Sequence, residues 1–248
     1  MRTAFFVDGY NLFYGLLADT PYKWLDLRSL LSHIAHVENP QSTTTSVDYF
    51  TSSVKPSLAT RGQASKEAQD TYIRALKTTH ICVHYGHHQL EPAKAPRFVD
   101  RKTKASRKDK VDIWKLEEKE TDVHIAISMY RTAAKQTKLK HHERLEQLVL
   151  VSSDTDMTPA LKAVREDFPE ITIGVILPHR AELNRPSPGS LKQHAHWIRR
   201  VVTCDELQSH QFPNRVPTHK APRYQTGLLV TILLPDTPAL SQPKPLLH

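Results

Sequence analysis

Short continuous apolar runs alternate along this chain with stretches of helical periodicity. The first run, residues 4–7, ends at an Asp-Gly pair and leads into an apolar stretch at 11–17, which is typical of a buried strand followed by a helix. Asp26 is a helix-capping residue type, and apolar positions recur at helical spacing from 27 to 34. The chain therefore opens as a β-α unit followed by a second helix.

The same alternation continues to about residue 202. The run at 147–152 is continuously apolar, as expected for a strand in a parallel sheet that is covered on both faces. Thr121 is expected to cap the helix before this strand. Strands alternating with helices predict a Rossmann-like α/β domain with a central, mostly parallel sheet flanked by helices. Further strands are expected at 47–51, 81–85, 111–114, 171–177 and 198–202, and helices at 65–77, 121–134, 159–166 and 191–195.

Two segments depart from this pattern. Residues 92–110 contain prolines and a basic cluster, and they are expected to form a long loop of functional interest. Beyond residue 213 the composition turns to Pro, Thr, Lys and His. We therefore expect one domain over 1–213 and a Pro-rich, flexible tail over 214–248 that extends away from the core. Within the tail, the apolar run 228–234 could form an edge strand or contact a partner.

Composition narrows the class of protein. The chain of 248 residues has 39% hydrophobic and 24% charged residues, which suits a globular protein. Its net charge of +8 favours polyanions, nucleic acid above all, as partners. Cys82 and Cys204 lie far apart without a ligand-like set of partners, which disfavours a disulfide scaffold or a thiolate zinc site. No apolar run is long enough for a signal peptide or a membrane span, so we expect a cytoplasmic protein without a membrane partner.

Four aspartates stand where parallel α/β folds build their sites. Asp8 follows the first apolar run, Asp154 and Asp156 follow the strand 147–152, and Asp122 opens the helix before that strand. Any one of them could instead be a helix cap or a turn residue. Four carboxylates at one sheet edge repel one another and need a cation. Mg²⁺ or Mn²⁺ would meet that need and would suit hydrolysis of a phosphodiester.

Three segments carry a family resemblance: FVDGYNL at 6–12, EEKETDV at 117–123 and LVSSDTDM at 150–157. They resemble the signature segments of the NYN domain, bacterial type, a branch of the PIN-like nuclease superfamily. The resemblance extends from residue 4 to about 213, and the shorter segments 22–27, 49–51, 83–87 and 211–213 also fit it.

The resemblance implies a divalent-metal-dependent endoribonuclease that hydrolyses RNA phosphodiester bonds. In it, Asp8, Asp122, Asp154 and Asp156 correspond to the catalytic, metal-binding cluster, and Asn11, Ser152 and Lys119 are supporting residues, Lys119 as a possible contact of the scissile phosphate. Two positions depart from the family pattern. Ser153 stands where glycine or asparagine is commoner, and Glu120 replaces the usual glycine before the helix.

Other groups supplement this cluster. Glu120 could be an extra ligand, although a glutamate is also favoured at a helix start by the helix dipole. The spacing of His84, His87 and His88 does not suit zinc. Tyr10, Phe13 and Tyr14 could stack RNA bases or pack against the core, and we expect packing for Phe13. A basic cluster in the long loop could hold phosphates near the metals, or it could be a solvated charge run: Arg101, Lys102, Lys104, Arg107, Lys108 and Lys110.

Two other functions compete with the ribonuclease hypothesis. A non-catalytic RNA-binding or regulatory module could retain the fold, although such a module has little reason to keep four carboxylates beside an RNA backbone. A phosphatase with an aspartate nucleophile would need a second aspartate two residues after the first, where this chain has Tyr10. The oligomeric state and the RNA that is cut stay open at this point.

Overall fold

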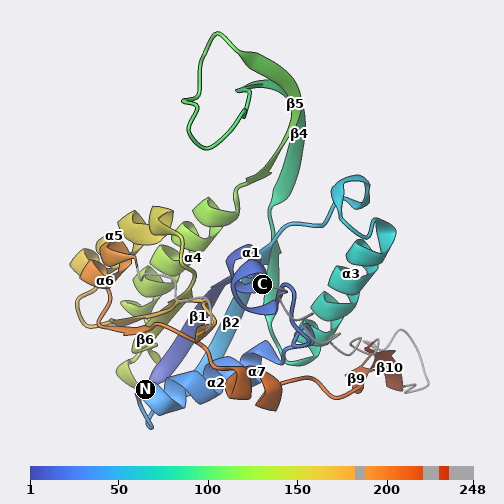
Figure 1. The fold of residues 1–248 in the computed structure, drawn as a ribbon. Helices are drawn as coiled ribbons and strands as arrows, with labels where there is room; N and C mark the ends of the chain where they lie inside the picture. Colours follow the sequence, from blue (N-terminus) through green and yellow to red (C-terminus); the bar gives the residue numbers. More distant parts are fainter. Residues whose placement is uncertain (182–187, 220–228, 235–248) are drawn as a thin grey trace, which may run out of the picture.

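Six strands pair side by side in a single parallel sheet in this computed structural model (Figure 1). The structure describes residues 1–181, 188–219 and 229–234. The central strand β6 is buried at every position, which agrees with its continuous apolar run. The expected parallel α/β fold is therefore confirmed. The strands of the sheet are β1 (Arg2–Asp8), β2 (Thr43–Thr51), β3 (Cys82–Tyr85), β6 (Gln147–Val151), β7 (Thr172–Ile176) and β8 (Trp197–Arg199).

The order of the strands creates a switch point in the middle of the sheet. The order is β3-β2-β1-β6-β7-β8, so the chain builds outward from β1 in one direction and then returns to start again at β6. Strands β1 and β6 pair in parallel, with Val7 opposite Val151. Their carboxyl ends therefore lie next to each other where the direction of winding reverses, which is where open α/β sheets form their binding crevices.

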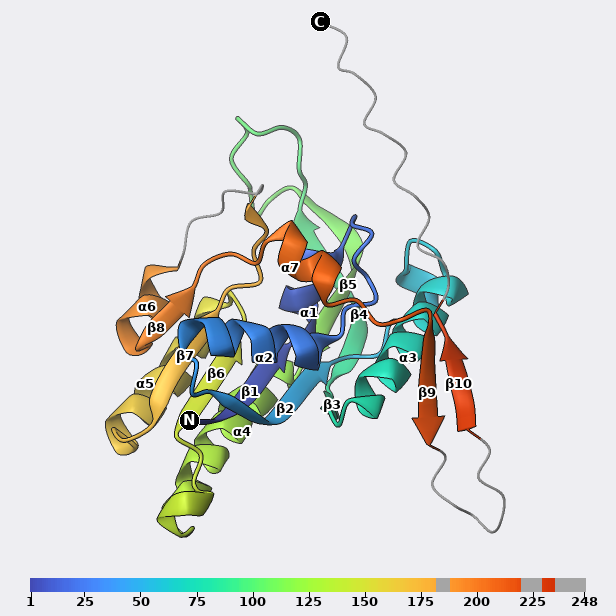
Figure 2. The same ribbon diagram turned by 90° about the horizontal axis from the view of Figure 1, so that it is seen from below.

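Helices cover both faces of the sheet (Figure 2). Alternate strand residues point to opposite faces: Phe5 and Val7 join the core beneath α2, α3 and α7, whereas Phe6 joins the core beneath α4, α5 and α6. Asp26 caps α2 by accepting from the backbone N–H of Ser29, as expected. The helices are α1 (Gly9–Leu12), α2 (Leu27–Glu38), α3 (Gln63–Thr78), α4 (Thr121–Gln136), α5 (Thr158–Asp167), α6 (Gly189–His194) and α7 (Cys204–Ser209), with a π-helical turn η1 (Phe13–Leu17) and the 3₁₀ turns η2 (Pro56–Leu58), η3 (His141–Glu143) and η4 (Thr155–Met157).

The segment expected to be a long loop is instead a two-stranded hairpin. Strands β4 (His87–Pro96) and β5 (Lys110–Lys119) pair in antiparallel register, with His87 opposite Lys119 at the base and Pro96 opposite Lys110 at the far end. Only residues 97–109 form the connecting loop. The hairpin, which we call the arm, stands out from the body of the domain (Figure 1). Prolines are compatible with it because both strands are edge strands, where a missing N–H costs nothing.

The start of α4 also differs from expectation. Glu120 and not Thr121 precedes the helix as its N-cap, and its backbone adopts the left-handed conformation with φ of 74°. Thr121 is the first helical residue, and its hydroxyl donates to Glu118. Glycine adopts positive φ without strain, which explains physically why the family pattern in the resemblance has glycine where this chain has Glu120.

Part of the C-terminal segment packs against the domain. Strands β9 (Arg215–His219) and β10 (Leu229–Leu233) form an antiparallel ribbon beside α3 (Figure 2). Val216 and Leu234 are 4% and 7% exposed and belong to the core. The apolar run 228–234 does contain a strand, but these two segments do not extend away from the core. The expected flexibility of 220–228 and 235–248 concerns residues outside the described part, and the boundary at 213 stays a prediction.

No helix within the described residues is both long enough and apolar enough to cross a membrane.

Candidate active site

The four aspartates come from three elements that meet at the switch point of the sheet. Asp8 ends β1, and Asp154 follows the neighbouring strand β6. Asp156 lies in η4, directly after Asp154, and Asp122 lies in the first turn of α4. Asp8 and Asp154 also cap the helical turns that follow them. The same two residues therefore cap a helical turn and lie at the crevice.

Asp8 is the buried anchor of this group. It is 3% exposed, and both of its carboxylate oxygens accept hydrogen bonds. Oδ1 accepts from the backbone N–H of Asn11 at 2.9 Å, and Oδ2 accepts from Asn11 Nδ2 at 2.7 Å and from Ser152 Oγ at 3.0 Å. Burial raises the pKa of Asp8 above its ordinary value, and these hydrogen bonds oppose that rise. Asn11 and Ser152 thus fix the orientation of the carboxylate.

A chain of hydrogen bonds connects Asp8 to the other acidic loop. Ser153 Oγ donates to Asn11 Oδ1 at 2.6 Å. Ser152 Oγ accepts from the backbone N–H of Asp154 at 3.0 Å, and Asp154 Oδ1 accepts from the N–H of Asp156 at 2.9 Å. The serine at position 153, a departure from the family pattern, therefore contributes a hydrogen bond that glycine lacks.

The negative charges of the carboxylates at this site raise the pKa of their neighbours. The pKa of Asp122 is raised to about 6, first by partial burial and then by the negative charges of Asp8, Asp154, Glu118 and Asp156. Carboxylates that interact in this way oppose each other's ionisation. A divalent cation bound between them would reverse that effect. The donor set, oxygen ligands only, suits Mg²⁺ or Mn²⁺.

Glu118 is a fifth acidic residue that the sequence analysis did not single out. Its Oε1 accepts from Ser52 Oγ at 2.8 Å and from Thr121 Oγ1 at 2.6 Å, and its charge raises the pKa of Asp8 and Asp122. It lies near the end of β5, a strand that was expected to end at 114. Without that strand, nothing in the sequence distinguished Glu118 from the acidic residues beside it.

The residues expected to contact phosphates are Lys119 and the basic cluster. Lys119 forms an ion pair with Glu117. In this structure the arm separates the basic cluster from the aspartates, and phosphate binding by the cluster stays a prediction. At about 3.3 Å per residue, the ten residues of β4 carry the tip roughly 30 Å from the base of the arm. Five cluster residues lie in the tip loop and the sixth begins β5, and all six are exposed: Arg101, Lys102, Lys104, Arg107, Lys108 and Lys110.

The three histidines near the arm do not converge on one point. His84 Nε2 contacts Asp48 Oδ1 at 2.7 Å, and His87 Nδ1 lies 3.4 Å from Glu120 Oε2. His88 lies between the carbonyl oxygen of Ser53 and the hydroxyl of Tyr10, each at 3.0 Å. Because a carbonyl only accepts, Nδ1 of His88 donates to Ser53, which leaves Nε2 to pair with the hydroxyl of Tyr10.

A shallow pocket of about 190 Å³ adjoins the acidic residues, lined by Tyr10, Asn11, Tyr14, Gly15 and Ser153. The rings of Tyr10 and Tyr14 lie 5.9 Å apart. Phe13 is 40% exposed and contacts Tyr14 edge-on, so the expected core packing of Phe13 is wrong. Aromatic faces are thus available beside the carboxylates.

A second group of potential metal ligands has its donor atoms closer together than the aspartates do. In the described part of the chain, one set of three donor atoms lies within 4.8 Å of one another, and it comes from Asp48, Cys82 and His84. The aspartates are spread more widely, which fits an ion that keeps several of its waters, as Mg²⁺ does.

Comparison with known proteins gives a family and one characterised relative. The NYN domain sequence model matches residues 2–185. The chain is 32% identical over 239 residues to 6-hydroxy-3-succinoylpyridine 3-monooxygenase HspA of Pseudomonas putida strain S16, covering 89% of this chain and 73% of that protein. A crystal structure of a protein of unknown function from Vibrio parahaemolyticus aligns with a TM-score of 0.45 and 14% identity, over 83% of this chain and 94% of the other. That similarity is too low to support an inference.

Proposed function

The chain belongs to the NYN domain family, a nuclease-type fold, and we propose that it is a divalent-metal-dependent endoribonuclease that hydrolyses RNA phosphodiester bonds through its aspartates. The observation that carries the proposal is the mutual influence of the carboxylates at the switch point. The pKa of Asp122 rises to about 6 because of partial burial and four neighbouring negative charges. Such a cluster is costly for a fold unless a cation binds to it.

The residues that would hold Mg²⁺ or Mn²⁺ are Asp8, Asp122, Asp154 and Asp156. When bound, such an ion activates water and stabilises the charge that develops on the phosphate. The chain contributes the geometry: Asn11 and Ser152 hold the Asp8 carboxylate, and the turn after β6 presents Asp154 and Asp156 on one short segment. Ordered carboxylates need no rearrangement when a substrate phosphate arrives.

RNA is the proposed partner because of the charge on the arm and the aromatic rings beside the site. Tyr10 and Tyr14 offer ring faces next to Asn11, where a base adjoining the scissile phosphate could stack. The basic residues at the tip would contact phosphates far from the cleavage point. Trp114 and Phe98 on the arm are 69% and 78% exposed and could stack further bases.

The test is cleavage of labelled single-stranded and structured RNA by the purified protein with Mg²⁺, Mn²⁺ or EDTA. We expect cleavage that needs the metal and is abolished in the double variant Asp154→Asn, Asp156→Asn. The matched control is Asp70→Asn, Asp205→Asn, which removes two carboxylates on α3 and α7, outside the site. Tight RNA binding without cleavage in any metal would overturn the enzyme proposal and favour a non-catalytic RNA-binding module.

A second candidate function comes from the characterised relative. Its name describes a monooxygenase acting on a substituted pyridine, and the identity to it covers most of this chain. The pocket beside Tyr10 and Tyr14, at about 190 Å³, is smaller than the 300 Å³ or more of common ligand sites but has room for a single aromatic ring. Hydroxylation would place one atom of O₂ on the ring and reduce the other to water with two electrons from a reductant.

This candidate is tested by incubating the protein with 6-hydroxy-3-succinoylpyridine, oxygen and a reduced nicotinamide or flavin, and following substrate loss and product mass. Turnover that is lost in Tyr14→Ala but retained in the double variant Asp154→Asn, Asp156→Asn would favour the monooxygenase. Metal-dependent RNA cleavage without pyridine turnover would favour the ribonuclease.

A further inference from the structure

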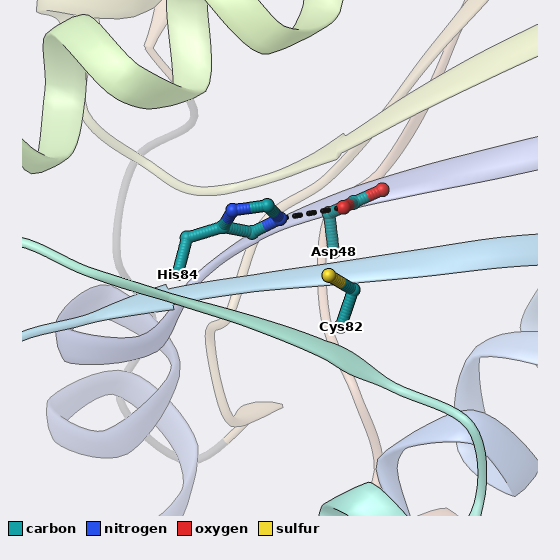
Figure 3. Close-up of side chains that lie close together, drawn as sticks. All are labelled: Asp48, Cys82 and His84. Carbon is teal, nitrogen blue, oxygen red and sulfur yellow. Dashed lines mark hydrogen bonds and ion pairs between the residues drawn. The ribbon is translucent and has the colours of Figure 1, made fainter.

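We propose that Asp48, Cys82 and His84 form a second metal site, for Zn²⁺ or a similar transition metal, that is separate from the aspartate cluster. Figure 3 shows the three side chains directed toward one another, with the imidazole of His84 bonded to the Asp48 carboxylate. One donor atom from each residue lies within 4.8 Å of the others. This inference does not depend on the proposed ribonuclease activity.

The register of the sheet creates the arrangement. Asp48 on β2 is directly opposite Cys82 on β3, and His84 follows Cys82 by two residues. Residues two apart on a strand point to the same face, so all three side chains project from one face of adjacent strands. The strand pairing thus brings together residues that are 34 and 36 positions apart in the chain.

The distances fit a tetrahedral ion after small movements of the side chains. Bonds of about 2.0–2.3 Å at tetrahedral angles place the ligand atoms of a zinc site roughly 3.3–3.6 Å apart. His84 Nε2 and Asp48 Oδ1 are 2.7 Å apart, with a proton between them, and would need to separate by less than about 1 Å to admit an ion. The thiol would need to move closer to the other two donor atoms by up to about 1.5 Å, which rotation of the Cys82 and Asp48 side chains can supply.

The chemistry of the donors selects the type of metal. One thiolate and one imidazole favour Zn²⁺, Co²⁺ or Cu²⁺ over Mg²⁺ and Mn²⁺, which prefer oxygen. An ordinary ion pair would explain the contact between His84 and Asp48, but it leaves the adjacent thiol without a role. Activation of the thiol as a nucleophile does not fit, because burial and the Asp48 carboxylate raise the pKa of Cys82, partly offset by Lys77.

Two features suggest what the ion would do. The His84 ring stacks on Phe50, with centroids 4.6 Å apart and planes 14° from parallel, which fixes the position of the imidazole. Three protein ligands leave a fourth position, and Cys82 is exposed, so water can occupy it. The ion would connect β2 to β3, the edge strand that leads into the arm. We assign it a stabilising role there.

The test uses Co²⁺, whose bond to a thiolate gives a charge-transfer band in the near ultraviolet. The chelator-treated full-length protein is titrated with Co²⁺ and then with Zn²⁺. We expect the band in the wild-type protein, its loss on adding Zn²⁺, and a Zn²⁺-dependent rise in melting temperature. The band should be absent in Cys82→Ser and present in Cys204→Ser, which replaces the other cysteine. His84→Ala should weaken Co²⁺ binding at least tenfold.

The outcomes separate this site from the aspartate cluster, because only a thiolate gives the band. No band in the wild-type protein would overturn the proposal, whether or not Cys82→Ser folds. A band that persists in Cys82→Ser and disappears in Cys204→Ser would also overturn it. Failure of RNA cleavage would leave the band unaffected, and Cys82→Ser should still cleave RNA if the aspartates do so.

Discussion

Asp122 is the residue whose ionisation is most affected by its surroundings. Its pKa is about 6 in the folded protein, against an ordinary value of 3.8. A carboxyl whose pKa is raised on folding destabilises the fold when it ionises. The penalty is absent below the ordinary pKa, grows as pH rises between the two values, and is complete above about 6.

We therefore predict that Asp122→Asn stabilises the metal-free protein at neutral pH. Because the side chain is more than one-third exposed, we discount the full effect of the shift and expect a gain of about 1 kcal/mol in the free energy of unfolding. Urea unfolding in EDTA at pH 7 and near pH 4 measures it, and the gain should shrink at the lower pH. Mg²⁺ should stabilise the wild-type protein more than the variant.

The control for this prediction is Asp70→Asn. Asp70 pairs with Lys66 at 2.6 Å, so its loss should leave stability unchanged or slightly lower. Equal stability of Asp122→Asn and wild type at pH 7 would mean that the carboxylates do not repel one another as proposed.

Glu120 occupies a backbone conformation that suits glycine. Its φ of 74° lies in the left-handed region, which costs an L-residue about 1 kcal/mol or more. We predict that Glu120→Gly is more stable than Glu120→Ala by about 1 kcal/mol. Both variants lose the exposed contact between His87 and Glu120, so that loss cancels in the comparison. Thermal unfolding of the two variants side by side is the measurement, and equal melting temperatures would contradict it.

Residue patterns in the sequence were sufficient for some of these features and not for others. Asp8, Asn11 and Asp154 could be placed together because each follows a clear apolar strand or belongs to a segment resembling the family. Glu118 could not, since one of its two hydrogen bonds comes from Ser52, 66 positions earlier in the chain. The proximity of Asp48 to Cys82 depends likewise on pairing between distant strands. Such contacts are properties of the folded sheet and leave no local pattern.

At the scale of elements, the arm is the largest difference from expectation. Neither of its strands has a continuous apolar run, because the arm leaves the sheet and has no core to cover on either face. Pro92 and Pro96 are typical loop signals, yet they lie within β4. The two-residue alternation of a strand is visible only in the burial of β4 once the structure is known. Helices and central strands were easier to predict. A helix buries one apolar stripe and a central strand buries both faces, and each leaves a recognisable apolar pattern in the sequence.

If the protein binds RNA as proposed, the basic tip of the arm should govern the salt dependence of that binding. We predict that Lys102→Gln, Lys104→Gln, Lys108→Gln reduces the slope of log affinity against log salt by about 2, since each phosphate contact to a single strand contributes roughly 0.7. The measurement is RNA binding at several salt concentrations in the Asp154→Asn, Asp156→Asn background, where cleavage does not interfere. The slope should be reduced for every RNA sequence, because phosphate contacts carry no sequence information.

A matched control removes the same charge from the opposite end of the domain. Lys135→Gln, Lys138→Gln, Lys140→Gln alters three exposed lysines in the last turn of α4 and just after it, with Lys135 roughly 20 Å along the helix from Asp122. If both triple variants reduce the slope equally, the effect is due to net charge and not to the arm.

At the scale of the whole molecule, the path of the chain through the sheet brings the site together. Asp8 and Asp154 are 146 positions apart, but β1 and β6 are neighbours because the strand order reverses between them. Alternating strands and helices predicted the parallel sheet, and the family resemblance implied which aspartates meet. The strand order itself required the structure, since several orders satisfy the same alternation.

The C-terminal ribbon of β9 and β10 bears on the extent of the whole domain. Its contribution to the stability of the fold tests the domain boundary expected at residue 213. Val216 and Leu234 are buried in the core on the side of α2 and α3. Removing two such side chains should cost about 3–6 kcal/mol, an upper estimate from burial relative to an extended chain. We therefore predict that truncation after residue 213 lowers the urea midpoint, whereas truncation after residue 234 does not.

A point substitution distinguishes the loss of the ribbon's core contacts from the effect of shortening the chain. Val216→Ala should destabilise the full-length protein by about 1 kcal/mol or more, and Val201→Ala, at an exposed valine, should have little effect. If the protein ending at 213 is as stable as the full chain, the ribbon is dispensable and the domain ends where the sequence composition changes. If it is unstable, the folded unit includes β9 and β10, because Val216 in β9 and Leu234 directly after β10 complete the core.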